Sequence, residues 1–350
     1  MPTGNLSVTT FVIASIIKIA IVLWVLLTAV AYTVWLERKV VGHIQNRWGP
    51  TRVGPFGLLQ PLADGLKFIF KEDLTPPYVH KFLYILAPML ALSMSLIAIC
   101  LIPFGNSVNI AGMNIPLQIT DTNIALLIIL GITSIAVYGV ALAGWSSNSK
   151  YSLLGGLRAS AQMISYEVAL GLSLVGVLIL CGTFSLHGIV EAQTGTWFGF
   201  IPKWNIFKGQ FIAFFIYIMA AYAETNRIPF DLPEAETELV AGYHTEYSSM
   251  KFAMFFMAEY SNMVTVACLA SILFLGGWTG PVFGPPILHA LLPIFWFALR
   301  VLFFIFVYIW VRGTLPRFRY DQLMSFAWKF LLPLAIANVM ITALVVALRS

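Results

Sequence analysis

The stretch FLYILAPMLALSMSLIAICLIPF, residues 82–104, contains no charged side chain and decides the class of fold. A run of about 20 apolar residues is long enough, as a helix, to cross the hydrocarbon core of a bilayer. Hydrophobic residues make up 59% of the 350-residue chain and charged residues only 10%, which is too few charges to cover a soluble surface. The sequence therefore predicts a polytopic membrane protein and excludes soluble enzyme folds and disordered classes.

Further apolar runs lie on both sides of this stretch, one before it and six after it. The fifth run along the chain is the least well defined, because only residues 209–223 of it are free of charge. We expect an all-α fold, a single transmembrane domain over residues 1–350, with about eight transmembrane helices. The predicted spans are Phe11–Trp35, Phe82–Phe104, Asn123–Trp145, Ala159–Leu180, Phe207–Ala223, Phe252–Trp278, Ile287–Val311 and Phe326–Leu348.

Basic residues are distributed unevenly among the loops that join these spans. Of the 20 lysines and arginines, 15 lie in the odd-numbered loops or at the start of the last span, and three lie in the even-numbered loops and the tails. Cytoplasmic loops carry the excess of basic residues, so we expect the odd-numbered loops in the cytoplasm and both termini outside. The net charge of +5 mainly reflects this orientation and gives little support for nucleic-acid binding.

The first cytoplasmic loop, residues 36–81, begins with a stiff basic segment. RWGP at residues 47–50 and RVGP at residues 52–55 each place a proline after a glycine, which restricts both residues to extended or fixed backbone angles. Two guanidinium groups are thereby held on a non-helical loop. The alternative is an ordinary positively charged loop that binds lipid headgroups.

Residues 57–71 of the same loop predict an amphipathic helix. Their polar side chains are spaced four, three and four residues apart, on one helical face. The helix is too short to span a bilayer, so we expect it in the membrane interface, with packing on a partner subunit as the alternative. A groove between this helix and the first span would admit an amphipathic, lipid-soluble molecule.

The other long cytoplasmic loop, residues 224–251, is acidic. Its six carboxylates outnumber its two basic side chains, so its net charge is −4. Asp231 and Glu234 have the spacing of a helix N-terminus, and Glu238 follows on the same face as Glu234. Crowded carboxylates raise one another's proton affinity, which predicts groups that exchange protons near neutral pH. A solvated acidic docking face is the alternative.

Charged side chains also lie inside predicted spans, where they are costly and usually face a partner or a wet cavity. We expect Glu167 and Glu259 to be functional, Lys18 to extend toward the interface, and Arg300 to serve either as a counter-ion or in function. The chain contains no phosphate-binding glycine motif, no zinc motif and no C-x-x-C pair. It is therefore expected to carry no nucleotide, metal or iron–sulfur site of its own.

Two long motifs resemble the signatures of one family, the H subunit of bacterial NADH–quinone oxidoreductase (complex I; subunit 1 in mitochondria). The first is ERK at 37–39 with RWGPTRVGPFGLLQPLADGLK at 47–67 and FKED at 70–73. The second is AETNRIPFDLPEAETELVAGYHTEY at 223–247 with AEY at 258–260. The resemblance covers essentially the whole chain, although His43 and Asn46 differ from the residues expected in the first motif.

This resemblance implies a subunit at the heel of the membrane arm of complex I, in a bacterial plasma (inner) membrane. Its substrate is quinone, while NADH, flavin and iron–sulfur clusters belong to partner subunits. The implied partners are the other membrane-arm subunits, the peripheral-arm subunits of the quinone site, and membrane lipid. The quinone tunnel is implied to include Glu37, Arg38, Arg47, Trp48, Arg52 and Asp64, and the proton-coupling path Glu167, Glu224, Asp231, Glu234, Glu236, Glu238, Glu246 and Glu259.

Two other functions fit the residues. One is the equivalent membrane subunit of a membrane-bound hydrogenase, and the other is a stand-alone cation or proton transporter. Affinity isolation in mild detergent distinguishes these three hypotheses, because the leading one predicts copurification with quinone-reductase subunits.

Overall fold

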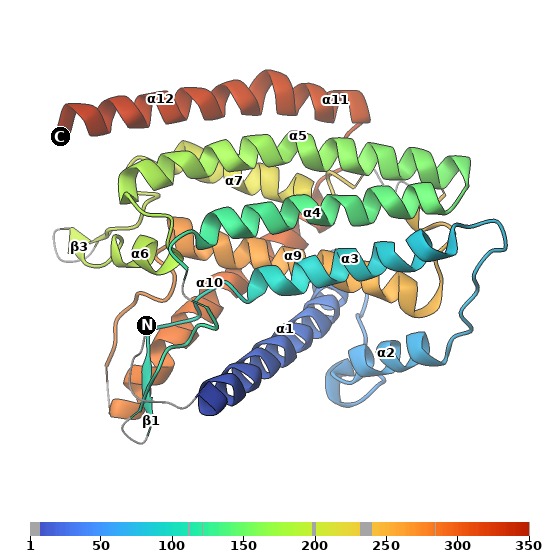
Figure 1. Ribbon diagram of the computed structural model, residues 1–350, viewed down its shortest axis with the longest axis horizontal. Helices are drawn as coiled ribbons and strands as arrows, with labels where there is room; N and C mark the ends of the chain where they lie inside the picture. Colours follow the sequence, from blue (N-terminus) through green and yellow to red (C-terminus); the bar gives the residue numbers. More distant parts are fainter. Residues whose placement is uncertain are drawn as a thin grey trace.

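Seven helices of the computed structural model are long and apolar enough to cross a membrane, within the residues that the structure describes, and Phe211–Glu224 is a shorter apolar helix among them (Figure 1). The described residues are 8–110, 113–120, 122–197, 201–231, 240–283 and 285–349. The predicted all-α membrane fold with about eight spans is confirmed.

The long helices are joined by short helical turns and two small hairpins. Strands β1 and β2 pair antiparallel, as do β3 and β4. The α-helices are α1 (Val8–Ile44), α2 (Gln60–Phe70), α3 (Lys81–Ile99), α4 (Ala125–Ser146), α5 (Lys150–Cys181), α6 (Leu186–Glu191), α7 (Phe211–Glu224), α9 (Ser249–Phe274), α10 (Pro286–Thr314), α11 (Tyr320–Phe326) and α12 (Leu332–Arg349). The other elements are the 3-10 turns η1 (Pro55–Gly57) and η2 (Gly242–His244), a π turn η3 (Ala327–Leu331), and strands β1 (Val108–Ile110), β2 (Met113–Ile115), β3 (Thr196–Trp197) and β4 (Ile201–Pro202).

Two helices are longer than the apolar runs that predicted them. Helix α1 continues past Trp35 to Ile44, so Glu37 and Arg38 belong to the helix and not to a loop. Helix α5 begins at Lys150 and therefore carries both Arg158 and Glu167. Hydropathy marks only the part of a helix that suits lipid, whereas backbone hydrogen bonding continues until the chain turns, as it does after α1 at Asn46, whose φ is 55°.

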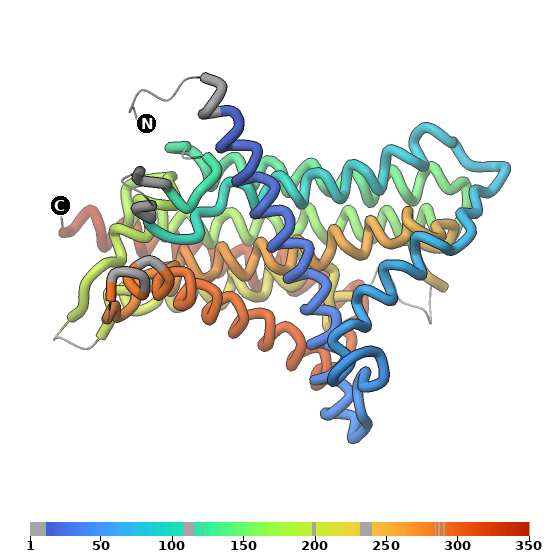
Figure 2. The backbone as a smooth tube through the Cα atoms, turned by 90° about the horizontal axis from the view of Figure 1, so that it is seen from below, coloured from blue at the N-terminus to red at the C-terminus, as the bar shows by residue number. Residues whose placement is uncertain are grey.

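The helices run roughly along one axis, with α1 and α10 crossing the others obliquely (Figure 2). Helix α2, the α4–α5 turn and the start of α9 lie at one end of the bundle. Helix α6 and the end of α12 lie at the other end. The odd-numbered and even-numbered loops are therefore separated, as their different contents of basic residues predict. That the first end faces the cytoplasm stays a prediction.

Helix α9 is the central helix of the bundle. It packs against α1, α3, α7 and α10, and nearly every residue from its midpoint to its end is buried. By contrast, the N-terminal half of α1 exposes large apolar side chains such as Ile16 and Trp24, as expected of a helix facing lipid. Glu259 lies just before this buried half of α9, and its side chain is only 13% exposed.

Arg300 lies on α10 and is bound to the loop that follows α9. Its guanidinium donates hydrogen bonds to the backbone carbonyls of Gly277 and Thr279 and lies 5.0 Å from the ring centroid of Trp204. These contacts satisfy carbonyl groups beyond the end of a helix. Of the two roles expected for Arg300, they favour the structural one.

Candidate functional site

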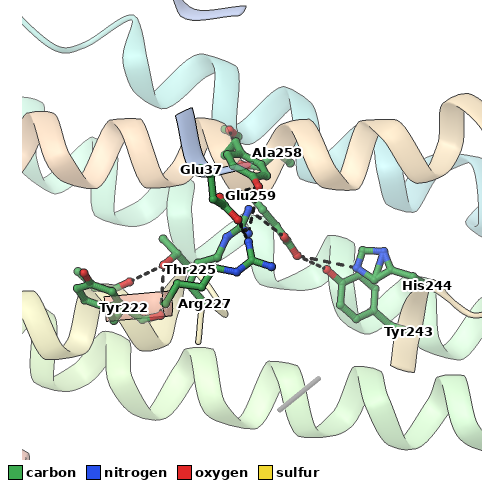
Figure 3. Close-up of polar contacts among 12 residues, drawn as sticks. Glu37, Tyr222, Thr225, Arg227, Tyr243, His244, Ala258 and Glu259 are labelled. Carbon is green, nitrogen blue, oxygen red and sulfur yellow. Dashed lines mark hydrogen bonds and ion pairs between the residues drawn. The ribbon is translucent and has the colours of Figure 1, made fainter. Parts of the chain in front are cut away.

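A largely buried cluster of charged side chains lies where α1, α9 and α10 meet the loop after α7 (Figure 3). Glu37 of α1 forms an ion pair with Arg312 of α10. Nη1 of Arg227 lies 4.0 Å from the other carboxylate oxygen of Glu37, and both side chains are only 10% exposed. One buried carboxylate is thus shared by two arginines. We call Glu37, Arg227, Glu259 and Arg312 the charge cluster.

Two neighbouring residues of α9 complete this arrangement. The hydroxyl of Tyr260 donates a hydrogen bond to Oε2 of Glu37 at 2.8 Å. The guanidinium of Arg227 lies 3.9 Å from the ring centroid of Tyr260, and its Nη2 lies 3.8 Å from Oε2 of Glu259. Arg227 therefore bridges two carboxylates that come from different helices, and Figure 3 shows it pointing between them.

The second oxygen of Glu259 faces η2. Tyr243 donates a hydrogen bond to Oε1 of Glu259 at 2.9 Å, and Nε2 of His244 lies 3.9 Å from the same oxygen. Burial lowers the pKa of His244 from 6.5 to about 3. The imidazole is therefore neutral near pH 7 and contributes a polar contact, not a positive charge, to this group.

We expect His244 to make the assembled protein less stable in mild acid. Its folded pKa, about 3, lies below its unfolded value of 6.5, so acid favours the unfolded state between these two values. The stability contributed by the neutral imidazole is complete above pH 6.5 and falls by about 1.4 kcal/mol for each pH unit below it. Melting temperatures of the purified complex at pH 7 and pH 5 measure this, and His244→Gln should reduce the difference between them. An unchanged difference in the variant would show that His244 does not titrate on unfolding.

Glu224, the last residue of α7, lines two cavities in the interior. The first is also lined by Glu259, Tyr243 and Asn262, and about 30 Å³ of it is open to a water molecule. The second is smaller and is lined by Thr133 and again by Asn262. A water molecule needs roughly 10–15 Å³, so the first cavity has room for water between polar groups. Glu224 and Glu259 therefore line the same small cavity, among mostly apolar side chains.

Glu167 extends this series of carboxylates toward the middle of the bundle. It lies on α5 and accepts a hydrogen bond from the hydroxyl of Ser134 on α4. It is also close enough to Glu224 to interact with it electrostatically. Four of the predicted site residues, contributed by α1, α5, α7 and α9, thus follow one another through the protein, each buried or partly buried: Glu37, Glu259, Glu224 and Glu167.

The predicted tunnel residues other than Glu37 lie around α2, whereas Glu37 belongs to the charge cluster. The polar face of α2 turns toward α1, where Nη1 of Arg38 lies 2.7 Å from Oδ2 of Asp64. Much of the apolar face is exposed in this chain, and Phe70 is 84% exposed. Arg47 donates to the Gln45 side chain at 2.8 Å, while Trp48 and Arg52 are exposed. These residues form an exposed basic and aromatic surface beside the buried charge cluster.

Two further acidic residues of the second long loop have partners outside the charge cluster. Asp231 pairs with Arg317 at 3.1 Å, and Glu246 accepts a hydrogen bond from Tyr78 at 3.1 Å, which raises the pKa of that phenol. The predicted helix start at Asp231 falls on residues 232–239, which lie outside the described residues. Three of the predicted site residues lie in that segment: Glu234, Glu236 and Glu238.

Sequence reasoning missed the cations and hydroxyls of the cluster. Arg227 lies inside the second motif, where its position among carboxylates was a signal that it neutralises them. Arg312 at the end of the seventh span was counted only toward orientation. Tyr243 and Tyr260 gave no signal, because a tyrosine near an apolar run is common in membrane proteins.

No group of three histidine, cysteine or carboxylate side chains able to hold a metal ion occurs among the described residues. The three cysteines, Cys100, Cys181 and Cys268, are free thiols. The charge cluster itself is made of paired charges.

Comparison with known proteins identifies the family. A family described as NADH dehydrogenase matches residues 17–343. An NADH-quinone oxidoreductase H subunit of Koribacter versatilis (strain Ellin345), the one numbered 2, is 72% identical, over 98% of this chain and 99% of its own length. The H subunits numbered 1 of Solibacter usitatus (strain Ellin6076) and Geobacter sulfurreducens are each 50% identical, the former over 96% of this chain and 98% of its own length and the latter over 97% of both chains. The resemblance found in the two sequence motifs is confirmed, and the chain belongs to the NADH dehydrogenase family of NADH-quinone oxidoreductase H subunits.

Proposed function

We propose that this chain is the membrane subunit of proton-pumping NADH–quinone oxidoreductase that admits quinone from the bilayer and couples its reduction to proton movement. It is then part of an oxidoreductase complex and a multi-pass protein of the inner membrane, with quinone as its substrate. The relatives named above are all H subunits of such oxidoreductases, so the hydrogenase and transporter alternatives are not favoured.

One observation supports the coupling role most strongly. A largely buried cluster of two carboxylates and two arginines, Glu37, Glu259, Arg227 and Arg312, lies beside the α1–α2 surface, and its Glu259 lines the same interior cavity as Glu224. Its formal charges cancel when both carboxylates are ionised. Adding or removing one proton would leave an uncompensated buried charge, which is costly in a low-dielectric interior.

The chemistry of quinone explains why such a balanced cluster is useful. Reduction of a quinone to a quinol takes two electrons and two protons, so negative charge develops whenever electrons arrive first. That charge changes the proton affinity of nearby ionisable groups. We propose that Glu37 responds first, and that the response passes through Arg227 and Glu259 to Glu224 and Glu167.

The mouth of the quinone path is proposed to lie between α1 and α2. Arg38, Asp64 and the stiff segment with Arg47, Trp48 and Arg52 would guide the quinone head, while the exposed apolar face of α2 contacts its tail or the bilayer. NADH, flavin and iron–sulfur clusters are proposed to belong to partner subunits of the peripheral arm. Both termini are proposed to face outside, with α2 at the cytoplasmic end.

Arg47→Ala and Arg52→Ala test the tunnel. In the assembled complex, each should lower quinone reduction several-fold and leave electron transfer from NADH to a water-soluble acceptor nearly intact, because that transfer does not use this chain. Arg319→Ala is a matched control, since Arg319 is an exposed arginine outside the proposed tunnel. Equal loss of both activities in fully assembled Arg47→Ala or Arg52→Ala enzyme would contradict the proposal.

A further inference from the structure

We infer that a row of aromatic side chains on α9 transmits a displacement of α2 to the charge cluster. Phe252 and Phe256 are then positioning residues for the coupling reaction. The inference rests on the proposed function, because it assigns α2 to the quinone path and the cluster to proton coupling. We call Phe68, Phe252, Phe256 and Tyr260 the aromatic ladder.

The ladder forms a continuous set of ring contacts from α2 into the bundle. Phe68 of α2 lies 6.1 Å from Phe252 between ring centroids. Phe252 lies 6.3 Å from Phe256, and Phe256 lies 4.7 Å from Tyr260. The three α9 residues are four apart, so they share one face of that helix. Each step from α2 to the cluster is thus a contact between two rings.

The outer end of the ladder is fixed by a set of polar contacts between α2 and the start of α9. Ser249, the first residue of α9, donates to the backbone carbonyls of Phe68 at 2.8 Å and Lys71 at 3.0 Å. These carbonyls belong to the last turn of α2 and to Lys71, the residue that follows the helix, and they would otherwise lack helical partners. Lys251 adds an ion pair with Asp73 at 3.0 Å. The end of α2 is therefore held to the helix that carries the ladder.

The inner end of the ladder is part of the charge cluster. Tyr260 donates to Glu37 at 2.8 Å, and its ring lies 3.9 Å from the guanidinium of Arg227. A small movement of this ring therefore changes the contacts of one buried carboxylate and one buried cation together. Aromatic rings have few torsions and pack at fixed separations, so displacement at Phe68 is transmitted and not absorbed.

The placement of Phe68 distinguishes the ladder from ordinary core packing. Most large apolar residues of α2 are exposed, including Leu62, Ile69 and Phe70, whereas Phe68 is partly buried against α9. Besides this contact, α2 is held to α1 through Asp64 and Arg38. Both attachments of α2 thus lead to helices that contribute a carboxylate to the charge cluster.

A double-mutant cycle tests the inference in the assembled complex. Phe68→Leu and Tyr260→Phe are made singly and together, and turnover and KM are measured with a soluble quinone analogue. Distant residues that act independently give effects that multiply. For each variant we take the ratio of its kcat to that of the wild type. We expect the ratio for the double variant to differ by about threefold or more from the product of the two single-variant ratios. We expect little departure in KM, since neither substitution removes a group from the tunnel surface.

A third substitution asks whether the ladder carries this interaction. With Phe256→Leu present, the departure should disappear, while Phe214→Leu should leave it unchanged. Phe214 is also partly buried and packs 5.3 Å from Phe274, away from the ladder. If Phe256→Leu enzyme does not assemble, Ser249→Ala takes its place, because it loosens α2 without opening a large cavity.

The inference would be overturned if the effects of Phe68→Leu and Tyr260→Phe on kcat simply multiplied. It would also be overturned if their departure from multiplication persisted in both the Phe256→Leu and the Ser249→Ala backgrounds. The proposed function is judged separately by Arg47→Ala, which compares two electron acceptors in a single variant. Arg47→Ala could selectively lose quinone reduction while the effects of Phe68→Leu and Tyr260→Phe simply multiply. That pair of results would support the proposed function and contradict only the role of the aromatic ladder.

Discussion

Replacement of Arg227 by methionine is expected to destabilise the subunit by about 3–5 kcal/mol, the cost of leaving a buried charge without its partner. Glu37 would keep Arg312, but Glu259 would lose the cation that lies 3.8 Å from it. Methionine preserves much of the volume and packing of the arginine stem, so the loss reports the missing charge. Melting temperature and the fraction of assembled complex in mild detergent measure the effect.

An exposed arginine provides the control for this change. Arg319 is 76% exposed and pairs with Asp321 at 3.0 Å, so Arg319→Met should be nearly neutral, as is usual for solvated ion pairs. Arg227→Lys should lie between the two, because it keeps the charge but loses the flat group that stacks on Tyr260. If Arg227→Met proved as mild as Arg319→Met, the cluster would not depend on charge balance.

The second large effect concerns activity. Glu259→Gln and Glu167→Gln should each lower quinone-reductase turnover about tenfold, which corresponds to one pKa unit or about 1.4 kcal/mol of lost coupling. Glutamine keeps the shape and hydrogen-bonding capacity of glutamate but cannot exchange a proton. In a tightly coupled enzyme a blocked proton step also slows the electron step. Turnover of assembled enzyme with a quinone analogue measures this.

A carboxylate far from the series provides the comparison. Glu191 is 68% exposed, ends the short helix α6 and lies near His187 at the opposite end of the bundle from α2. Glu191→Gln should keep normal turnover. Equal losses in Glu191→Gln and Glu259→Gln would indicate a general effect of changing the protein's charge, and would remove support for a dedicated series.

The number and type of the helices could be predicted from the sequence because the bilayer imposes a strict length and composition on each span. The amphipathic helix at Gln60–Phe70 was equally accessible, since the spacing of Gln60, Asp64 and Lys67 places them on one face. Glu167 and Glu259 could be selected because ionisable groups inside spans are costly and need a reason. These features follow from local sequence and the solvent alone.

The partners of these carboxylates could not be predicted in the same way. Glu37 meets Arg312 and Tyr260 only because α1 and α10 cross the bundle obliquely and converge on α9 (Figure 2). Crossing angles depend on how side chains of different helices interdigitate, which one sequence does not reveal. The aromatic ladder is hidden for the same reason, because phenylalanines four apart on an apolar helix are also typical of lipid-facing surfaces.

Proton movement in sealed vesicles provides the most direct measurement of coupling through the buried carboxylates. Assembled wild-type and Glu259→Gln complexes are reconstituted, and NADH oxidation is recorded together with acidification of the vesicle lumen. We predict that both rates fall together in Glu259→Gln, while electron transfer to a water-soluble acceptor is retained. Normal rates of quinone-linked NADH oxidation and acidification in that variant would contradict proton coupling through Glu259 and leave the cluster a structural one.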